Sequence, residues 1–411
     1  MASNAAAPAP QEPRDPAVAA SGKRHMEWTF QSMPVLRSIR KQLIRSQSLA
    51  GMRIAACLHA TTETANLMIT LRDGGASPIL CPVSQESLQK DVVASLEADY
   101  GIPVVSPAAA LERNPQLLID SGAHLAEVWK NQAGAAVVGS TESNATGVAR
   151  LKTMAKAGTL SYPVIAVNDA MTKHLFDNRY GTGQSTMDGI LRATNILLAG
   201  MNVVVAGYGW CGRGVASRAR GMGANVIVCE VDPIKALEAL MDGYRVMSMN
   251  DAAAIGDVFV TVTGNRAVIH RDHFDKLKNG AILCNSGHFN VEIDLEALGR
   301  VSSGKKQTRE FVEEYSMRDG RKIYVLGEGR LINLSSAEGH PAAVMDMSFA
   351  NQALSVEYLV KSHSTLDKKV YAVPDQLDRQ VARLKLEAMG IIIDRLSVEQ
   401  ENYLSGWSEE A

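Results

Sequence analysis

The apolar residues of the first half of the chain fall into short continuous runs separated by stretches with helical spacing. The runs lie at 52–60, 77–83, 117–120, 135–141 and 162–169, and the helical stretches between them include 61–76 and 147–160. Continuous runs of this length are typical of strands buried on both faces of a sheet, and their alternation with helices is typical of parallel α/β layers. The pattern predicts an α/β domain over this part of the chain.

The alternation begins again near residue 200, now with a glycine signature. The apolar run 203–206 leads into Gly207, Gly209 and Gly212, spaced as GxGxxG, and a helical pattern follows. In a dinucleotide fold such glycines permit the turn, let the backbone approach the pyrophosphate and let the helix pack on the strand. The next strand ends in Glu230, 23 residues after the first glycine, where an acid binds the ribose diol and repels a 2′-phosphate. The pattern predicts an NAD site.

The remainder of the chain extends this picture. Apolar runs at 243–249, 257–265, 281–289 and 322–334 predict a parallel doubly wound sheet of about six strands around the NAD site. From residue 340 onward the spacing is helical, and the stretch 378–397 has more apolar positions than one intramolecular stripe needs, so we expect a homo-oligomer. The Ala/Pro-rich residues 1–24 predict a disordered leader.

Composition narrows the classes of function. The chain has 411 residues, 46% of them hydrophobic, and a net charge of −2, so we expect two domains with substantial cores and no nucleic-acid or membrane partner. It has no apolar stretch of the roughly 18 residues that a membrane helix needs. The five cysteines form no CxxC or Cys/His cluster, which predicts reduced thiols, a cytoplasmic protein and no metal site.

Several motifs resemble one known family. They are "VNDAMTKHLFDNRYGTGQSTMDGILRATNILLAGMNVVVAGYGWCGRG", "NSGHFNVEID" and "LINLSSAEGHPAAVMDMSFANQ", and together they resemble the S-adenosylhomocysteine hydrolase family. The resemblance implies a Rossmann NAD-binding domain (183–340) inserted into a second α/β, substrate-binding domain (25–182 and 341–390), with a short C-terminal segment at 391–411. It also implies an active site between the domains, an adenine nucleoside substrate and a tetramer.

The resemblance further implies that NAD serves as a catalyst and is regenerated. Oxidising the ribose 3′-hydroxyl to a ketone acidifies the neighbouring C4′–H, so a base removes that proton and the 5′ substituent leaves by β-elimination. The stored hydride is returned at the end of the cycle.

Residue roles follow from matching positions. The resemblance assigns Lys173 and Asp177 to the 3′-hydroxyl, with Asn178 supporting them, and His59 to acid–base work at the 4′ and 5′ carbons. The positions that match substrate contacts and closing loops are Thr61, Glu63, His288 and His340. The positions that match cofactor contacts are Gly207, Gly209, Gly212, Glu230, Asn265, Asn333 and Thr146.

The chain departs from the family on the substrate side. Where the family has paired aspartates, this chain has Asp120 followed by Ser121, and Glu142 is the only acid in "STESNATG". Ser121 and Glu142 are therefore candidates for rebuilt proton transfer.

Three functions stay open. The leading hypothesis is a nucleoside dehydratase or lyase that oxidises the nucleoside and eliminates a small 5′ group, with water as the expected leaving group. The alternative is an adenosylhomocysteinase that gives adenosine and homocysteine. The third is an inactive NAD-binding regulator of an active paralogue, against which the retained His59, Lys173 and Asp177 speak.

Overall fold

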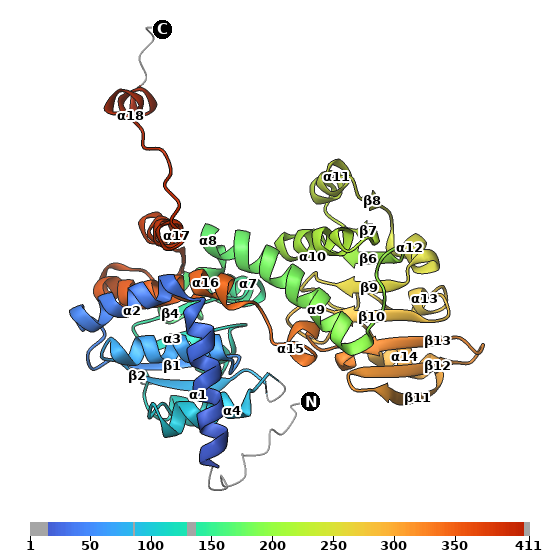
Figure 1. Cartoon of the computed structure of the whole chain (residues 1–411), viewed down its shortest axis with the longest axis horizontal. Helices are drawn as coiled ribbons and strands as arrows, with labels where there is room; N and C mark the ends of the chain where they lie inside the picture. The colour runs from blue at the N-terminus through green and yellow to red at the C-terminus, as the bar shows by residue number, and fades with distance from the viewer. Residues whose placement is uncertain (1–14, 85–86, 130–136, 407–411) are drawn as a thin grey trace.

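The computed structural model describes residues 15–84, 87–129 and 137–406 and contains two α/β domains, each built on its own sheet (Figure 1). The first sheet has the strand order β14-β5-β4-β3-β1-β2, and every neighbouring pair is parallel. Its strands are β1 (Arg53–Leu58), β2 (Ser77–Pro82), β3 (Leu117–Asp120), β4 (Gly139–Glu142), β5 (Val164–Ala166) and β14 (Val370–Ala372). Because β14 comes from the far end of the chain, the C-terminal part completes the first domain.

Helices cover both faces of this sheet, so its strands are buried as their apolar runs predict. One apolar core joins the sheet to α1 (Pro16–Gln31), α2 (Pro34–Ser46), α3 (Thr62–Asp73), α4 (Lys90–Ala98), α16 (Ala342–Ser362) and α17 (Asp375–Ala388). A second core on the other face joins it to α5 (Pro107–Leu111), α6 (His124–Trp129) and α7 (Ala145–Lys156).

The second sheet confirms the predicted dinucleotide fold. Its six parallel strands run in the order β13-β10-β9-β6-β7-β8, with the glycine-loop strand β6 at the position where the strand order reverses. They are β6 (Asn202–Ala206), β7 (Asn225–Cys229), β8 (Arg245–Val246), β9 (Val258–Thr261), β10 (Ala281–Asn285) and β13 (Lys322–Leu326). An antiparallel hairpin that the apolar pattern did not predict, β11 (Ser302–Arg309) and β12 (Val312–Met317), extends the β13 edge.

The helices of this domain pack on both faces of the sheet. One face carries α9 (Thr182–Thr194), α10 (Trp210–Gly221), α11 (Pro233–Met241) and α15 (Ile332–Ser335). The other carries α12 (Met249–Ile255), α13 (Arg271–Phe274) and α14 (Leu295–Val301). Figure 1 shows α9 and α15 at the side that faces the first domain.

The chain passes from the first domain to the second through α8 (Met171–Lys173), a π-helix (His174–Gly181) and α9. Two glycines let these segments lie against α10. A Cβ on Gly214 would come within 1.8 Å of the Arg179 carbonyl oxygen, and one on Gly183 within 2.5 Å of the Gly214 carbonyl oxygen. The close backbone approach fixes the connecting segment against the glycine-loop helix, so the residues on it are held at the border between the domains.

The N-terminal leader predicted at 1–24 is wrong for residues 16–24, which belong to α1. Asp15 caps this helix by accepting a hydrogen bond from the Ala17 amide, and Pro16 occupies its first turn. Gly22 packs so closely on α4 that a Cβ there would lie 2.0 Å from the Asp91 carbonyl oxygen. Residues 1–14 lie outside the described part.

The predicted C-terminal helix also ends earlier than its apolar pattern suggests. Helix α17 stops at Ala388, residues 391–397 are not helical, and α18 (Val398–Ser405) follows. Figure 1 shows this end of the chain reaching away from the rest of the protein. Within the described residues, every helix is too short or too polar to cross a bilayer.

Candidate active site

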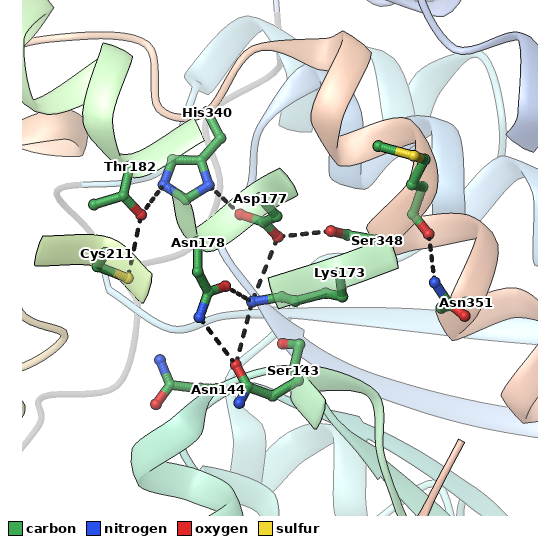
Figure 2. Close-up of polar contacts among 12 residues, drawn as sticks. Ser143, Asn144, Lys173, Asp177, Asn178, Thr182, Cys211, His340, Ser348 and Asn351 are labelled. Carbon is green, nitrogen blue, oxygen red and sulfur yellow. Dashed lines mark hydrogen bonds and ion pairs between the residues drawn. The ribbon is translucent and has the colours of Figure 1, made fainter. Parts of the chain in front are cut away.

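A buried lysine lies at the start of the connecting segment between the two domains. The Lys173 Nζ lies 2.6 Å from the Asn178 Oδ1, 3.4 Å from the Asp177 Oδ2 and 3.4 Å from the Asn168 Oδ1 (Figure 2). The π-helix that follows Lys173 has a wider turn than an α-helix, and here it presents Asp177 and Asn178 together to the lysine. The structure thus brings together the three residues that the resemblance assigns to hydroxyl oxidation.

Asp177 connects this lysine to the returning chain. Its carboxylate accepts hydrogen bonds from His340 Nδ1 and, at 2.6 Å, from the Ser348 hydroxyl on α16. Burial favours a raised pKa for Asp177, but the opposite charges of Lys173 and His340 outweigh it and hold the pKa well below its usual range. Asp177 is therefore an anion at neutral pH.

The network continues to the glycine loop of the Rossmann domain. The His340 Nε2 lies 3.3 Å from the Thr182 Oγ1, and this hydroxyl lies 3.5 Å from the Cys211 Sγ, which sits within the GxGxxG turn (Figure 2). The carboxylate is thereby linked through two side chains to the turn predicted to hold the cofactor.

A cavity of about 170 Å³ opens beside this network. The predicted site residues that line it are His59, Thr61, Glu63, Ser121, Lys173, Asp177, His288, Asn333 and His340. They come from both domains, so the cavity lies between them.

The wall opposite the lysine comes from the ends of β1 and α3. His59 follows β1, and its Nδ1 lies 2.7 Å from the Ser87 Oγ. Burial lowers the pKa of His59 to about 4, so the imidazole is neutral at pH 7. Thr61 caps α3, and burial raises the pKa of Glu63 in the first turn of that helix.

The carboxyl groups of Asp120 and Glu142, at the ends of β3 and β4, bond to backbone amides. Glu142 accepts hydrogen bonds from the amides of Gly122 (2.9 Å), Ala123 (2.8 Å) and Asn144 (2.7 Å), and it does not line the cavity. Burial raises its pKa to about 8. The prediction that Glu142 is catalytic is therefore not supported by its position, because its oxygens already hold the loop that carries Ser121.

Asp120 has a similar structural role. Its carboxylate accepts hydrogen bonds from the amides of Ser121, His124, Leu125 and Ala126 at 2.8–3.1 Å, and burial raises its pKa to about 6. Ser121 itself faces the cavity. A hydroxyl thus stands on the wall where the family resemblance leads us to expect a carboxylate.

The glycine turn fits a dinucleotide. Gly207 has a φ of +104°, and a Cβ on Gly212 would lie 2.0 Å from the Gly207 carbonyl oxygen, so both positions require glycine. A Cβ on Gly209 would meet no heavy atom within 4 Å, which leaves that face of the turn open to a pyrophosphate. Glu230 follows β7 and accepts a hydrogen bond from the Tyr208 amide at 2.7 Å, which places its carboxylate beside the turn.

The other predicted cofactor positions have different surroundings. Asn333 donates a hydrogen bond to the Ser185 hydroxyl at 3.1 Å, while its buried Oδ1 has no hydrogen-bond partner in the described part of the chain. Such an acceptor suits the carboxamide of a nicotinamide. The Thr146 hydroxyl lies 3.4 Å from the point where a Cβ of Gly264 would stand, so it faces a loop of the Rossmann domain. Asn265 is exposed on the same loop.

The resemblance did not single out three polar neighbours of the network, nor His124, which lies outside it. Asn168, Thr182 and Ser348 lie within the motifs quoted above, so comparison of those motifs residue by residue could have identified them. His124 gave no sequence signal beyond following the loop after β3.

The second domain has a Rossmann sheet and a glycine turn that fits a dinucleotide, and a buried Lys–Asp pair lies beside a cavity between the two domains. These features define an NAD-dependent enzyme with a second α/β domain. The sequence comparisons name the family within this class. Residues 178–339 match the S-adenosyl-L-homocysteine hydrolase NAD-binding domain, and residues 12–112 match S-adenosyl-L-homocysteine hydrolase. The chain belongs to the S-adenosylhomocysteine hydrolase family, and NAD is its cofactor.

Near relatives are similar over almost their whole length. The chain is 55% identical to an adenosylhomocysteinase of Gloeobacter violaceus, covering 97% of this chain and 96% of the relative. It is 57% identical to one of Aquifex aeolicus, covering 96% and 98%. Among solved structures it resembles a dipicolinate synthase chain from Bacillus halodurans, with a TM-score of 0.50 and 14% identity over 76% of this chain and 99% of that one, which indicates a shared fold only.

Proposed function

We propose that the protein is an adenosylhomocysteinase that cleaves S-adenosylhomocysteine to adenosine and homocysteine. The observation that carries the proposal is the buried Lys173–Asp177–His340 network beside an interdomain cavity. The adenosylhomocysteinases that are 55% and 57% identical to the chain support it further. This favours the alternative of the sequence analysis over the nucleoside dehydratase or lyase, which neither of these two relatives supports.

Different residues of the chain serve different steps of the proposed reaction. Lys173, held by Asp177 and Asn178, takes the proton of the 3′-hydroxyl as the carbon is oxidised, and for this step it must be in the neutral amine form that the positive charge of a bound nicotinamide favours. NAD, when bound, would supply the hydride acceptor for this oxidation. His59, which is neutral, serves acid–base steps at the 4′ and 5′ carbons, and Thr61 and Glu63 hold the adenine. The buried oxygen of Asn333 orients the nicotinamide carboxamide.

One observation favours the dehydratase as a second candidate. Ser121 lines the cavity and Glu142 is turned into the backbone, so the wall that handles the 5′ substituent lacks a carboxylate from either residue. A neutral wall alters proton transfer there, and it would suit a smaller leaving group than a thioether.

Incubation of purified protein with S-adenosylhomocysteine and a thiol-trapping reagent separates these functions. The adenosylhomocysteinase proposal expects catalytic release of homocysteine. Absence of thiol, combined with reduced-cofactor absorbance on adding adenosine, would overturn it in favour of the dehydratase. Absence of both signals would favour the inactive regulator.

We also propose a cytoplasmic homo-oligomer, a tetramer by family resemblance. All five cysteines lie within the described residues and are free thiols, which suits a reducing compartment. The C-terminal segment exposes Met389 and the run 391–393, with Ile392 96% exposed. Apolar side chains exposed in a row suit an interface. A monomer mass by light scattering at micromolar concentration would contradict the proposal.

A further inference from the structure

The segment that carries Lys173 is held at its start by a side chain from the C-terminal part of the chain. The Asp378 carboxylate, on α17, accepts hydrogen bonds from the Met171 amide at 2.5 Å and from the Thr172 amide at 3.0 Å. It also accepts a hydrogen bond from the Thr172 hydroxyl. Asp378 is buried, so water competes little for these donors. The three bonds fix the two residues that come immediately before Lys173.

Helix α16 holds the same point from a second side. The Asn351 side-chain amide donates to the Thr172 hydroxyl at 2.7 Å and to the Met347 carbonyl oxygen at 3.0 Å. The Thr172 hydroxyl therefore accepts from Asn351 while it donates its single proton to Asp378. Two helices of the returning chain thus fix the backbone from which Lys173 extends.

Helix α17 is anchored independently of Asp378. Val381, one turn further along the helix, is completely buried. The Lys385 Nζ donates to the Ala343 carbonyl oxygen at 2.8 Å and pairs with the Asp346 carboxylate at 2.9 Å, both on α16. We therefore expect α17 to keep its place when the Asp378 carboxylate is removed.

The side-chain contacts of Lys173 leave its nitrogen dependent on this backbone. The Asn178 oxygen lies 2.6 Å from the Nζ, but the Asp177 and Asn168 oxygens lie at 3.4 Å, which is long for a hydrogen bond. The lysine stem is a flexible chain of four carbons. The position of the Nζ is therefore set largely by where the backbone of residue 173 is held.

We propose that Asp378 is a positioning residue for Lys173. Its carboxylate fixes the backbone of Met171 and Thr172 and so sets where the Lys173 nitrogen meets the hydroxyl that is oxidised. Asp378 does not line the cavity, so it acts through the lysine and not on the substrate. The inference rests on the hydroxyl oxidation within the proposed function. A misplacement of about 1 Å can cost about 10²-fold in rate, so loss of Asp378 should slow hydride transfer while adenosine and NAD still bind.

Rapid mixing of the full-length, NAD-loaded enzyme with saturating adenosine tests this role. In Asp378→Ala the rate constant for the rise of reduced-cofactor absorbance should fall by about 10–10²-fold. The amplitude per bound NAD and the KM for adenosine should stay as in the wild type. A merely structural role predicts the opposite, because a smaller folded fraction lowers the amplitude and leaves the rate constant unchanged. Asp375→Ala is the matched control, since Asp375 lies exposed on the same helix and pairs with Arg379 at 2.6 Å.

Two milder variants should grade the effect. Asp378→Asn should keep most of the rate, because one amide oxygen can accept from two successive backbone amides. Asn144 does this in the same protein, where its Oδ1 accepts from the amides of Thr146 at 2.8 Å and Gly147 at 3.4 Å. Thr172→Val removes one of the three bonds to Asp378 and should slow hydride transfer by a smaller factor than Asp378→Ala. An unchanged rate constant in Thr172→Val would count against the inference even if Asp378→Ala failed to fold.

A double variant shows whether Asp378 acts through the lysine. Lys173→Ala/Asp378→Ala should be no slower than Lys173→Ala alone, because the group to be positioned is gone. An unchanged rate constant in Asp378→Ala, a loss of amplitude alone, or a full further loss in the double variant would overturn the inference and leave the proposed function standing. A wild type that oxidises adenosine but releases no thiol from S-adenosylhomocysteine would overturn the proposed function alone. A wild type that forms no reduced cofactor would overturn both.

Discussion

The two sides of the cavity use their charged residues in opposite ways. On the side of the connecting segment, Lys173 and His340 pair with Asp177, and all three line the space where a substrate would lie. On the side of β3 and β4, the carboxyl oxygens of Asp120 and Glu142 accept hydrogen bonds from backbone amides. The side chains that face the cavity there carry hydroxyl groups instead. The comparison teaches that a retained acidic residue can shape a loop without touching the reaction.

Replacing Lys173 should have the largest effect on the reaction. Lys173→Ala should reduce hydride transfer by about 10²–10⁴-fold, because the hydroxyl proton loses its acceptor. Reduced-cofactor absorbance after mixing with adenosine measures this step. Lys152→Ala is the control, since Lys152 is exposed and pairs with Asp169 at 3.2 Å. Normal absorbance in Lys173→Ala would show that the network is only structural.

Removing His59 from the opposite wall should block a later step of the reaction. His59→Ala should keep hydride transfer but lower thiol release from S-adenosylhomocysteine by about 10²–10⁴-fold, because proton transfer at the 4′ and 5′ carbons loses its imidazole. Reduced cofactor should then accumulate. Equal loss of absorbance in His59→Ala and Lys173→Ala, with NAD still bound, would contradict the division of labour between the two walls.

The sequence predicted the Rossmann side better than the substrate side, for physical reasons. A dinucleotide-binding turn needs particular residues at fixed spacing, so the roles of Gly207, Gly212 and Glu230 could be predicted from a short stretch of sequence. The side-chain direction of Glu142 depends on backbone amides about 20 residues earlier in the chain. Ser121 lines the same cavity as His59 because β1 and β3, which precede them, pair in parallel. Neither relation leaves a local pattern.

The N-terminal helix and the edge of the second sheet were also predicted incompletely from the sequence. The strand alternation predicted the six parallel strands, but the start of α1, residues 16–24, was missed because it depends on an Asp15 cap and on Gly22 packing against α4. The β11–β12 hairpin was missed because β11 is largely exposed and lacks an apolar run. Apolar periodicity reports burial, so it cannot reveal elements that are mostly exposed.

Removing Glu230 tests the cofactor side at a smaller scale. Glu230→Ala should weaken NAD retention by roughly one to two orders of magnitude, because a charge-assisted hydrogen bond to the ribose diol is worth about 1.5–3 kcal/mol. Bound nucleotide measured after gel filtration reports the effect. Glu296→Ala, on α14 of the same domain, should retain NAD as the wild type does. Full NAD occupancy in Glu230→Ala would remove this residue from the cofactor site.

Removing Glu142 should cost stability. Glu142→Ala leaves the amides of Gly122, Ala123 and Asn144 without their acceptor, and a buried unpaired donor costs about 1–3 kcal/mol. The free energy of unfolding from a denaturant titration should fall by at least that amount. Glu127→Ala, which removes an exposed partner of Arg150, is the matched control. Unchanged stability in Glu142→Ala would contradict its structural role.

Stability should also depend on pH because of His59. The pKa of His59 is about 4 in the folded protein and about 6.5 in an unfolded chain, so between these values the unfolded chain binds more protons. The free energy of unfolding should therefore fall on acidification from pH 7 toward pH 4, by up to about 1.4 kcal/mol per pH unit for this one group.

Replacing the group should flatten that slope. In His59→Gln the free energy of unfolding should change less between pH 7 and pH 5, because no imidazole is left at this position to take up a proton on unfolding. The slope should fall by up to about 1.4 kcal/mol per pH unit, the amount that one proton contributes. Phe289 lines the same space as His59 and has no titratable group, so Phe289→Leu should keep the wild-type slope. An identical slope in His59→Gln and the wild type would mean that His59 is not held neutral by burial. Its assignment as the neutral acid–base group opposite Lys173 would then have to be abandoned.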